Sequence, residues 1–262
     1  MIICAAEDTH GELNKMYADI LAFEASLAVR FDYVLHVGDF GIWPDSNKVD
    51  RATRDHDGAG DFPSWFAERK QAPRPTIFIK GNHEDFEYLA KIDDNEVLPN
   101  LTYLSNGEVL ELKGGIRLGG IGGCFGPSNY ERKSSRLQGY ARRHFTRDEI
   151  ENLGKQGKID ILLLHDAPAG IEIVKPGRGD LVHRYKSTAT GLAEVLKMTN
   201  PHVCFFGHHH VRMDAELAGV PCIGLNKVGF PGNLFAIEIG KPTDNFIILV
   251  EWPAQKSRPG QI

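Results

Sequence analysis

The sequence predicts an α/β fold in which two mixed sheets pack face to face and helices cover their outer sides. Short β-branched runs alternate with longer helical stretches, a pattern typical of βαβ units around a mainly parallel sheet. A second pattern, short strands separated by glycine turns, occupies residues 101–123, and more strand-like runs follow after residue 222. Both patterns together indicate two sheets rather than one.

The parallel part is expected to contain five strands, each ending in polar or glycine-rich residues. They cover Ile2–Ala6, Tyr33–Val37, Thr76–Lys80, Ile159–Leu164 and Val203–Phe206. Between the first two strands, apolar residues recur at helical spacing over Glu12–Val29, which predicts a helix connecting parallel neighbours.

Two further groups of residues are predicted to be β-rich. The first contains Leu101–Leu104, Val109–Leu112 and Ile116–Ile121, separated by the hairpin-type dipeptides Asn106-Gly107 and Gly114-Gly115. The second contains Cys222–Leu225, Leu234–Ile239 and Phe246–Glu251. Because no repeat or long linker interrupts the pattern, we expect a single domain over residues 1–252. The tail Pro253–Ile262 is expected to be frayed.

The composition is that of an ordinary globular protein. The 262 residues include 30 Lys+Arg and 35 Asp+Glu, so the formal net charge is −5, and 42% of residues are apolar. A chain of this length can bury a core without disulfides or structural metals. The mildly acidic total argues against nucleic-acid binding over the whole surface, but it leaves room for a local basic patch.

The cysteines and the apolar runs indicate a cytoplasmic protein. The four cysteines are scattered and form no CxxC pair, which predicts reduced, buried thiols. No apolar run approaches the roughly 20 residues needed to span a bilayer. The apolar start Ile2–Ala6 lacks a basic n-region and runs into Glu7 and Asp8, so we expect neither a signal peptide nor a membrane partner.

Polar clusters follow each of the five parallel strands. They are Asp8-Thr9-His10-Gly11, Gly38-Asp39, Gly81-Asn82-His83-Glu84, His165-Asp166 and Gly207-His208-His209-His210. Because ligands of α/β sheets bind outside the carboxyl ends of the strands, these clusters are expected to meet in one crevice. Their oxygen and imidazole donors, without thiolate, suit Mn²⁺, Fe or Zn²⁺ better than Ca²⁺.

Each cluster taken alone has a simple structural alternative. Asp8 could cap the following helix, Gly38-Asp39 could be a turn, and Asn82 could be a left-handed turn residue. His165 could be a hydrogen-bonded histidine at a strand end. The ordered set of five clusters is what favours a metal site.

The ordered motifs D-x-H, G-D, G-N-H-E, H and G-H-x-H resemble those of the calcineurin-like metallophosphoesterase superfamily. This resemblance implies a four-layer α/β/β/α sandwich with two divalent metal ions, Mn²⁺ being preferred. One metal would be held by Asp8, His10, Asp39 and His210, and the other by Asp39, Asn82, His165 and His208. Two such cations can acidify a water molecule between them and stabilise an in-line displacement at phosphorus.

A closer resemblance is to the RNA lariat debranching enzymes of that superfamily. It is carried by Thr9–Tyr17, Ala72–Glu84, Leu98–Leu104, Gly114–Gly123 and Ile159–Pro168. Debranching enzymes carry Cys at the place of Asp8, tend to have Ala at the place of Gly207, and have an additional C-terminal region. The resemblance implies a phosphodiesterase acting on nucleotide or RNA-like diesters, with 2′,5′ linkages among the candidates.

By the same resemblance, His83 faces the leaving oxygen as a general acid, a role typically worth about 10²–10⁴-fold in rate. Either Glu84 or Asp166 could orient a histidine by hydrogen bonding. We expect that His209, which would point away from its neighbours in an extended turn, is not a ligand.

A basic segment between Glu131 and Arg147 contains six Lys or Arg residues against one Glu, with aromatic residues interleaved. It is either a solvated surface loop or a lid that binds phosphate and nucleotide. In the debranching enzymes the corresponding stretch contacts RNA. The candidate substrate-binding residues are Arg132, Lys133, Tyr140, Arg142 and Arg143.

Two alternatives to a phosphodiesterase are open at this stage. Protein phosphatases of the superfamily follow the second motif with an arginine that grips a phosphate dianion, whereas this chain continues Asp39-Phe40-Gly41. That difference favours diesters over monoesters. A non-catalytic, metal-binding scaffold is the other alternative, and the oligomeric state is left open.

Overall fold

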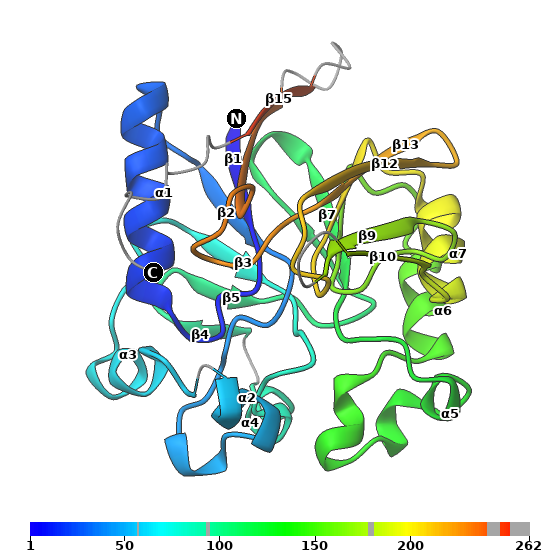
Figure 1. Cartoon of the computed structure of the whole chain (residues 1–262), viewed down its shortest axis with the longest axis horizontal. Coiled ribbons are helices and arrows are strands. Elements are labelled where there is room, and N and C mark those ends of the chain that lie inside the picture. Colours follow the sequence, from blue (N-terminus) through cyan, green and yellow to red (C-terminus); the bar gives the residue numbers. More distant parts are fainter. Residues whose placement is uncertain (57, 93–94, 178–180, 240–246, 252–262) are drawn as a thin grey trace.

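The computed structural model describes residues 1–56, 58–92, 95–177, 181–239 and 247–251. In this part of the chain, two large sheets pack face to face, as Figure 1 shows. Helix α1 (Leu13–Leu27) lies on the outer side of one sheet, and α6 (Arg147–Lys155) and α7 (Thr190–Thr199) lie on the outer side of the other. The predicted four-layer α/β/β/α architecture is therefore confirmed.

The first sheet contains seven strands among the described residues, in the order β15-β14-β1-β2-β3-β5-β4. Strands β1, β2, β3 and β5 run parallel, and the pairs β1–β14, β14–β15 and β4–β5 are antiparallel. The strands are β1 (Ile2–Ala6), β2 (Tyr33–His36), β3 (Thr76–Phe78), β4 (Glu96–Leu98), β5 (Leu101–Tyr103), β14 (Leu234–Ile239) and β15 (Ile247–Glu251).

The second sheet contains six strands among the described residues, in the order β12-β13-β11-β8-β7-β6. Its four central strands are parallel, and β6 and β12 close its edges in antiparallel pairs. The strands are β6 (Val109–Glu111), β7 (Arg117–Ile121), β8 (Ile161–Leu164), β11 (Val203–Phe206), β12 (Met213–Leu217) and β13 (Val220–Gly224). A separate two-stranded ribbon pairs β9 (Glu172–Pro176) with β10 (Val182–Lys186).

The alternation of side chains along the strands explains the layered core. In β1, Ile3 and Ala5 face the other sheet, where they join a buried cluster that also contains Leu163 and Phe205. Cys4 and Ala6 face the opposite way and pack with the apolar side of α1. A third buried cluster fills the space between the second sheet and helices α6 and α7.

The remaining helices are short, and η2 lies before the start of β7. They are α2 (Arg51–His56), α3 (Phe62–Glu68), α4 (Phe86–Leu89), α5 (Pro127–Tyr130), and the 3₁₀ helices η1 (Ser46–Lys48), η2 (Lys113–Gly115), η3 (Ser134–Arg136) and η4 (Gly139–Arg143). At the start of α6, Thr146 and Glu149 form a capping box, so this helix has a well-defined beginning.

The hairpin expected at Asn106-Gly107 is wrong, whereas the one at Gly114-Gly115 is confirmed by the β6–β7 pairing. Strand β5 pairs with β3 and β4 in the first sheet, and β6 belongs to the second sheet. The Asn106 side chain accepts from Gly122 N at 2.6 Å and donates to Gly122 O at 3.0 Å. These tertiary contacts fix the turn so that the chain passes from the first sheet to the second. Turn propensity alone does not predict this change of sheet.

The second β-rich group is also divided between the sheets, because β13 pairs with β11 while β14 pairs with β1. Phe246 and the tail Pro253–Ile262 lie outside the described residues. Three cysteines are buried as expected, but Cys124 is half-buried, and all four thiols are free. Within the described ranges, no helix is both long enough and apolar enough to cross a bilayer.

Candidate metal centre

The carboxyl ends of strands from both sheets meet at one place. Strands β1, β2 and β3 of the first sheet and β8 and β11 of the second deliver the five predicted polar clusters there. All seven predicted ligand residues lie in this region, six of them in two groups of three and Asn82 beside the second group.

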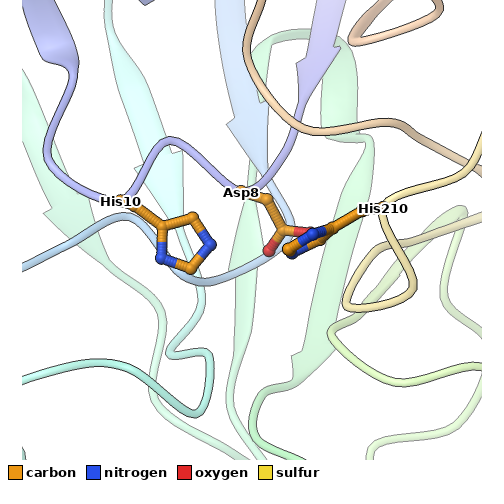
Figure 2. Close-up of side chains that lie close together, drawn as sticks. All are labelled: Asp8, His10 and His210. Carbon is orange, nitrogen blue, oxygen red and sulfur yellow. The ribbon is translucent and has the colours of Figure 1, made fainter. Parts of the chain in front are cut away.

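The first group consists of Asp8, His10 and His210, drawn in Figure 2. Each offers one ligand atom, and these atoms lie within 4.8 Å of one another. Asp8 Oδ2 lies 3.3 Å from His210 Nε2. Asp8 and His10 are buried, whereas the His210 side chain is 42% exposed, so this group is open to solvent on one side.

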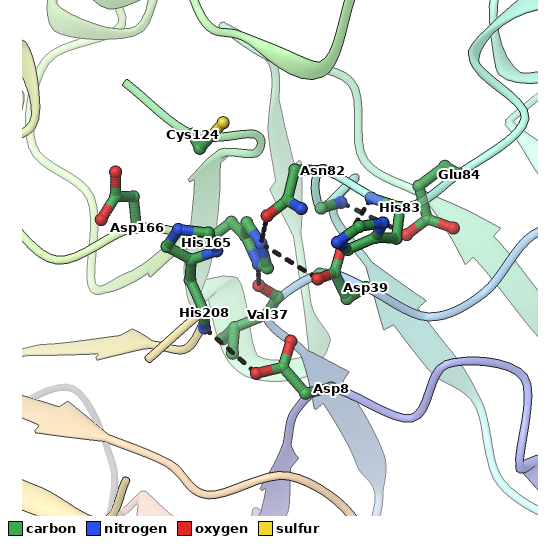
Figure 3. A network of polar contacts seen from close by, with 12 residues as sticks. Asp8, Val37, Asp39, Asn82, His83, Glu84, Cys124, His165, Asp166 and His208 are labelled. Atoms are coloured by element: carbon green, nitrogen blue, oxygen red, sulfur yellow. Dashed lines mark hydrogen bonds and ion pairs between the residues drawn. The ribbon is translucent and has the colours of Figure 1, made fainter. Parts of the chain in front are cut away.

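The second group consists of Asp39, His165 and His208, whose ligand atoms also lie within 4.8 Å of one another. Asn82 adjoins it, with Oδ1 3.0 Å from His165 Nε2, as Figure 3 shows. His165 Nδ1 lies 2.9 Å from the carbonyl oxygen of Val37 and donates to it. This hydrogen bond directs the other ring nitrogen, Nε2, into the group.

Asp39 connects the two groups. Its Oδ2 lies 3.5 Å from His165 Nε2 and 3.9 Å from His10 Nε2, so one carboxylate oxygen faces histidines of both groups. Its Oδ1 accepts from the backbone N–H of His83 at 2.8 Å. Asp39 therefore lies between the two groups.

The backbone is strained at the same residues. Five of the seven candidate ligands have positive φ between 41° and 68°, which non-glycine residues rarely adopt, namely Asp8, His10, Asp39, His208 and His210. Strained residues of this kind cluster at functional sites, where the surrounding structure enforces them. The backbone is also closely packed at Gly81, where an added Cβ would collide with the backbone and carboxylate of Asp39.

The carboxyl groups of Asp8 and Asp39 are both buried and interact with each other. Burial and the Asp39 charge raise the pKa of the Asp8 carboxyl well above its usual value. Burial also opposes ionisation of Asp39, but His165 and His10 bring the pKa of that carboxyl below its usual value. Asp8 Oδ1 is buried without a hydrogen-bond partner. A buried, unsatisfied carboxylate oxygen beside imidazoles fits a divalent cation.

Glu7 is a third buried carboxylate that sequence reasoning missed. It is fully buried, and burial together with the charge of Asp8 raises the pKa of its carboxyl. An added Cβ at Gly207 would collide with the Glu7 carboxylate. The Glu7 carboxylate thus lies directly against Gly207, and the position of Glu7 directly before the first motif was the available signal.

His83 lies beside the first group, with its ring centroid 5.6 Å from that of His10. Its Nδ1 lies 3.0 Å from Thr53 Oγ1 and 3.3 Å from Asp50 Oδ2. These contacts leave Nε2 as the ring nitrogen available to a substrate. Asp50 and Thr53 were not predicted, because they lie 33 and 30 residues away in the sequence and carry no motif.

Of the two candidates for orienting a histidine, Asp166 contacts a histidine ring, that of His209, whereas Glu84 binds backbone N–H groups. The Glu84 carboxylate accepts backbone N–H groups from both motif loops, those of Phe40, Gly41 and Ile42 at 2.7–3.0 Å and that of Gly81 at 3.2 Å. Glu84 therefore joins the loop after β2 to the loop after β3.

Asp166 contacts the histidine that was not expected to be a ligand. Asp166 Oδ1 lies 3.1 Å from His209 Nε2, and the other His209 nitrogen lies 3.1 Å from the hydroxyl of Tyr185. His209 is buried rather than pointing away from its neighbours. Both ring nitrogens face other partners, and His209 belongs to neither group of candidate ligands.

Hydrogen bonds attach the basic segment to neighbouring parts of the fold. The buried ammonium of Lys80 donates to the carbonyls of Arg142 at 2.8 Å and His144 at 3.3 Å. Gly139 N donates to Glu87 Oε1 at 2.9 Å. These anchors tie the segment to the ends of β3 and α4.

The predicted substrate residues divide into two sets. The Arg143 guanidinium stacks 4.0 Å over the Tyr140 ring, and Tyr140 lines a cavity of about 650 Å³ together with residues of α2 and Asp50. Arg142 Nε lies 3.6 Å from Glu87 Oε1. Arg132 and Lys133 are exposed, and Arg132 bonds to Asn129 and Arg136 within its own loop. The structure thus brings Tyr140 to the cavity that Asp50 also lines, but not Arg132 or Lys133.

A two-sheet sandwich with this donor set at the strand ends agrees with the family that the sequence motifs resemble. Residues 8–212 match the sequence profile of the calcineurin-like phosphoesterases. Because this match covers more than half of the chain, the protein belongs to the calcineurin-like phosphoesterase family.

Curated relatives of the chain are named lariat debranching enzymes. The chain is 29% identical over 226 residues to that of Danio rerio, which is 79% of this chain and 39% of the relative. It is 27% identical over 272 residues to lariat debranching enzyme A of Xenopus laevis, covering 95% of this chain and 50% of the relative. The chain thus spans half or less of the length of these relatives.

Solved structures share the fold at low sequence identity. A crystal structure of a Thermus thermophilus protein matches with a TM-score of 0.59 and 12% identity, covering 95% of this chain and 98% of that one. GAP50, described as the anchor in the inner membrane complex of Plasmodium, matches with a TM-score of 0.54 and 13% identity, covering 98% of this chain and 86% of that one. These likenesses concern the fold alone.

Proposed function

We propose that this chain is a binuclear metal-dependent phosphodiesterase that acts on nucleotide or RNA-like diesters. The observation that carries the proposal is the pair of ligand groups sharing Asp39, with His83 beside them. Asp8, His10 and His210 would hold one cation, Asn82, His165 and His208 the other, and Asp39 would contact both. Bound divalent cations would supply Lewis acidity at the phosphoryl oxygens and lower the pKa of a water molecule.

The protein's own residues supply the remaining steps of such a reaction. The carboxylates of Asp39 and Asp8 would supply the negative charge that holds divalent cations at the two groups. His83, held at Nδ1 by Asp50 and Thr53, presents Nε2 to donate a proton to the leaving oxygen. His165 is fixed in one orientation by the Val37 carbonyl.

A preference for diesters is supported by the residues that follow Asp39. Phe40 and Ile42 are fully buried, and their backbone N–H groups are bound by Glu84. No cationic side chain stands in this described stretch to grip a phosphate dianion. The cavity beside Asp50 and Tyr140 gives room for a second esterified group next to His83.

A nucleotide or RNA-like substrate is supported by the stacked pair of Tyr140 and Arg143 at this cavity. An aromatic ring with an adjacent guanidinium suits a base and its phosphate. The relatives named lariat debranching enzymes place 2′,5′-linked diesters among the substrates to test. At the first metal position, Asp8 in place of the Cys of debranching enzymes supports firm binding of both cations.

Mn²⁺ is the proposed metal, because the groups offer carboxylate, amide and imidazole donors without thiolate. The free state of all four cysteines supports the proposal that the protein works in a reducing compartment such as the cytoplasm.

The test compares substrates on one Mn²⁺-loaded preparation. The panel contains 2′,5′- and 3′,5′-linked dinucleotides, a cyclic nucleotide, a chromogenic diester and the matched chromogenic monoester. We expect hydrolysis of diesters with higher kcat/KM than of the monoester. A strong preference for the monoester would favour a phosphomonoesterase instead.

Chelation distinguishes the enzyme from a metal-binding scaffold. Metal content, thermal unfolding and diester hydrolysis are measured before chelation, after it, and after Mn²⁺ is restored. We expect two metal equivalents per chain, a lower unfolding temperature without metal, and activity that returns with Mn²⁺. A fully loaded protein that hydrolyses no ester would support the scaffold.

A further inference from the structure

The middle residue of the last motif, His209, has a polar partner at each nitrogen of its ring. His209 Nε2 lies 3.1 Å from Asp166 Oδ1, and His209 Nδ1 lies 3.1 Å from the hydroxyl oxygen of Tyr185. The His209 side chain is buried. Because a buried ring with contacts at both nitrogens has little freedom to turn, these contacts fix the position of residue 209 in the chain.

Asp166 is held in turn by backbone groups of two segments. Its Oδ2 accepts from the N–H of Phe125 at 3.1 Å, and its Oδ1 accepts from the N–H of Ala167 at 2.8 Å. Phe125 comes shortly after β7, and Asp166 comes shortly after β8. The carboxylate that faces His209 is therefore attached to the ends of two neighbouring strands.

The contact between Asp166 and His209 lies next to a pair of candidate ligands. His165 directly precedes Asp166 after β8, and His208 directly precedes His209 after β11, which is the parallel neighbour of β8. The ring centroids of His165 and His208 are 5.0 Å apart. His165, Asp166 and His208 can be followed in Figure 3. Each of these two candidate ligands is thus followed by one partner of the Asp166–His209 contact.

The residues on either side of His209 belong to different groups of candidate ligands. His208 belongs to the second group and His210 to the first. Both have positive φ, 68° and 51°, so contacts with the surrounding structure must enforce this conformation. The described contacts of this segment include the two at the His209 ring and a hydrogen bond from His208 N to Asp8 Oδ2 at 3.2 Å. A shift of residue 209 would therefore displace one donor of each group.

We propose that His209 is a positioning residue, fixed by Asp166 and Tyr185, that sets the metal affinity of both groups at once. This inference rests on the metal-binding part of the proposed function and not on hydrolysis. Side chains that hold metal ligands in place commonly account for about 10–100-fold in metal affinity. The three successive histidines then comprise two ligands and, between them, the residue that orients both.

The test measures Mn²⁺ binding by isothermal titration calorimetry and urea unfolding of the metal-free protein in parallel. His209→Leu removes both ring contacts. His209→Gln keeps a side-chain N–H that can face Asp166. Tyr185→Phe removes only the hydroxyl group and keeps the aromatic ring, so it perturbs the fold least.

His202→Leu is the matched control, because the same two strands carry another His–Asp contact at their other end. His202 directly precedes β11 and Asp160 directly precedes β8. His202 Nε2 lies 3.6 Å from Asp160 Oδ1. This contact joins the amino ends of the strands, whereas the candidate metal centre lies at their carboxyl ends. A purely structural effect of losing a His–Asp contact is therefore measured separately from an effect on the ligands.

We expect His209→Leu to weaken the binding of both Mn²⁺ equivalents by about 10–100-fold. His209→Gln should recover part of this loss. Tyr185→Phe should weaken binding at both groups by up to about tenfold, the effect of one hydrogen bond. His202→Leu should bind Mn²⁺ as the parent does, whatever its effect on the urea midpoint of the metal-free protein.

Three results would overturn the inference. They are an unchanged Mn²⁺ affinity in His209→Leu and Tyr185→Phe, a loss confined to one of the two groups, and a loss in His202→Leu as large as that in His209→Leu. If His209→Leu does not fold, the affinities of Tyr185→Phe decide in the same way. A parent that binds two Mn²⁺, with the expected losses in the variants, but hydrolyses no diester would refute the proposed phosphodiesterase and leave the positioning role of His209 established.

Discussion

Replacement of His83 by asparagine tests the proton donor of the proposed reaction. The backbone N–H of residue 83, which donates to Asp39 Oδ1 at 2.8 Å, is retained in His83→Asn, so the loop keeps its anchor. What is lost is the imidazole beside His10. We expect dinucleotide hydrolysis to fall by about 10²–10⁴-fold, the usual contribution of a general acid.

The leaving group decides whether this loss appears. A nitrophenolate departs without a proton, so bis(4-nitrophenyl) phosphate should lose less than about tenfold in kcat under the same conditions. The assay is therefore kcat of parent and variant on both substrates, with metal content measured in each preparation. Equal losses on both substrates with full metal content would refute the acid role.

The contacts of His83 set the size of a second, smaller effect. Thr53 Oγ1 and Asp50 Oδ2 approach Nδ1 at 3.0 and 3.3 Å, and one such hydrogen bond is worth about 0.5–1.5 kcal/mol. Since about 1.4 kcal/mol corresponds to tenfold, Thr53→Val should slow dinucleotide hydrolysis by up to about tenfold. In His83→Asn the same Thr53→Val change should have almost no further effect on rate, and an additive effect would contradict the orienting role.

Three further predictions concern the loops and the basic segment around the centre. Glu84→Gln removes acceptors from two backbone N–H groups and should lower the unfolding free energy by about 2–5 kcal/mol in urea titrations; a change below about 0.5 kcal/mol would contradict the role of Glu84. Gly207→Ala should destabilise the protein by about 1–3 kcal/mol through its collision with Glu7, and Glu7→Ala in the same chain should recover most of this loss; additive losses would show that the collision is not the cause. Arg143→Ala should weaken oligonucleotide binding several-fold and reduce the dependence of binding on salt. Arg147→Ala should do neither, because the Arg147 guanidinium is paired with Glu131 at 2.6 Å; equal effects of the two substitutions would show that the basic segment acts only through its total charge.

The residues of the centre could be predicted from the sequence because the geometry of parallel strands is general. The carboxyl ends of such strands meet at one edge, and Asp8, Asp39, Asn82, His165 and His208 each follow one. The structure brings them together, and their role as metal ligands stays a prediction. The spacing also located helix α1, which ends within two residues of its expected bounds.

The contacts between distant loops could not be predicted in this way. Nothing in the sequence pairs Asp50 with His83 or Lys80 with the carbonyls of the basic segment. The same limit explains the error at Asn106-Gly107, where the turn is held by Gly122 and leads to the other sheet. Turn propensity describes local conformation, whereas the choice of the next strand depends on tertiary contacts.

The sequence by itself determined which donors exist and that they follow strands, because strand periodicity and residue chemistry are local properties. Only the tertiary structure decided that Asp39 faces both groups and that the Glu7 carboxylate lies against Gly207. These facts depend on the packing of one sheet against the other, since each joins side chains that come from different layers or loops. Distances of a few ångströms between such side chains are set by the whole fold, and no short stretch of sequence contains them.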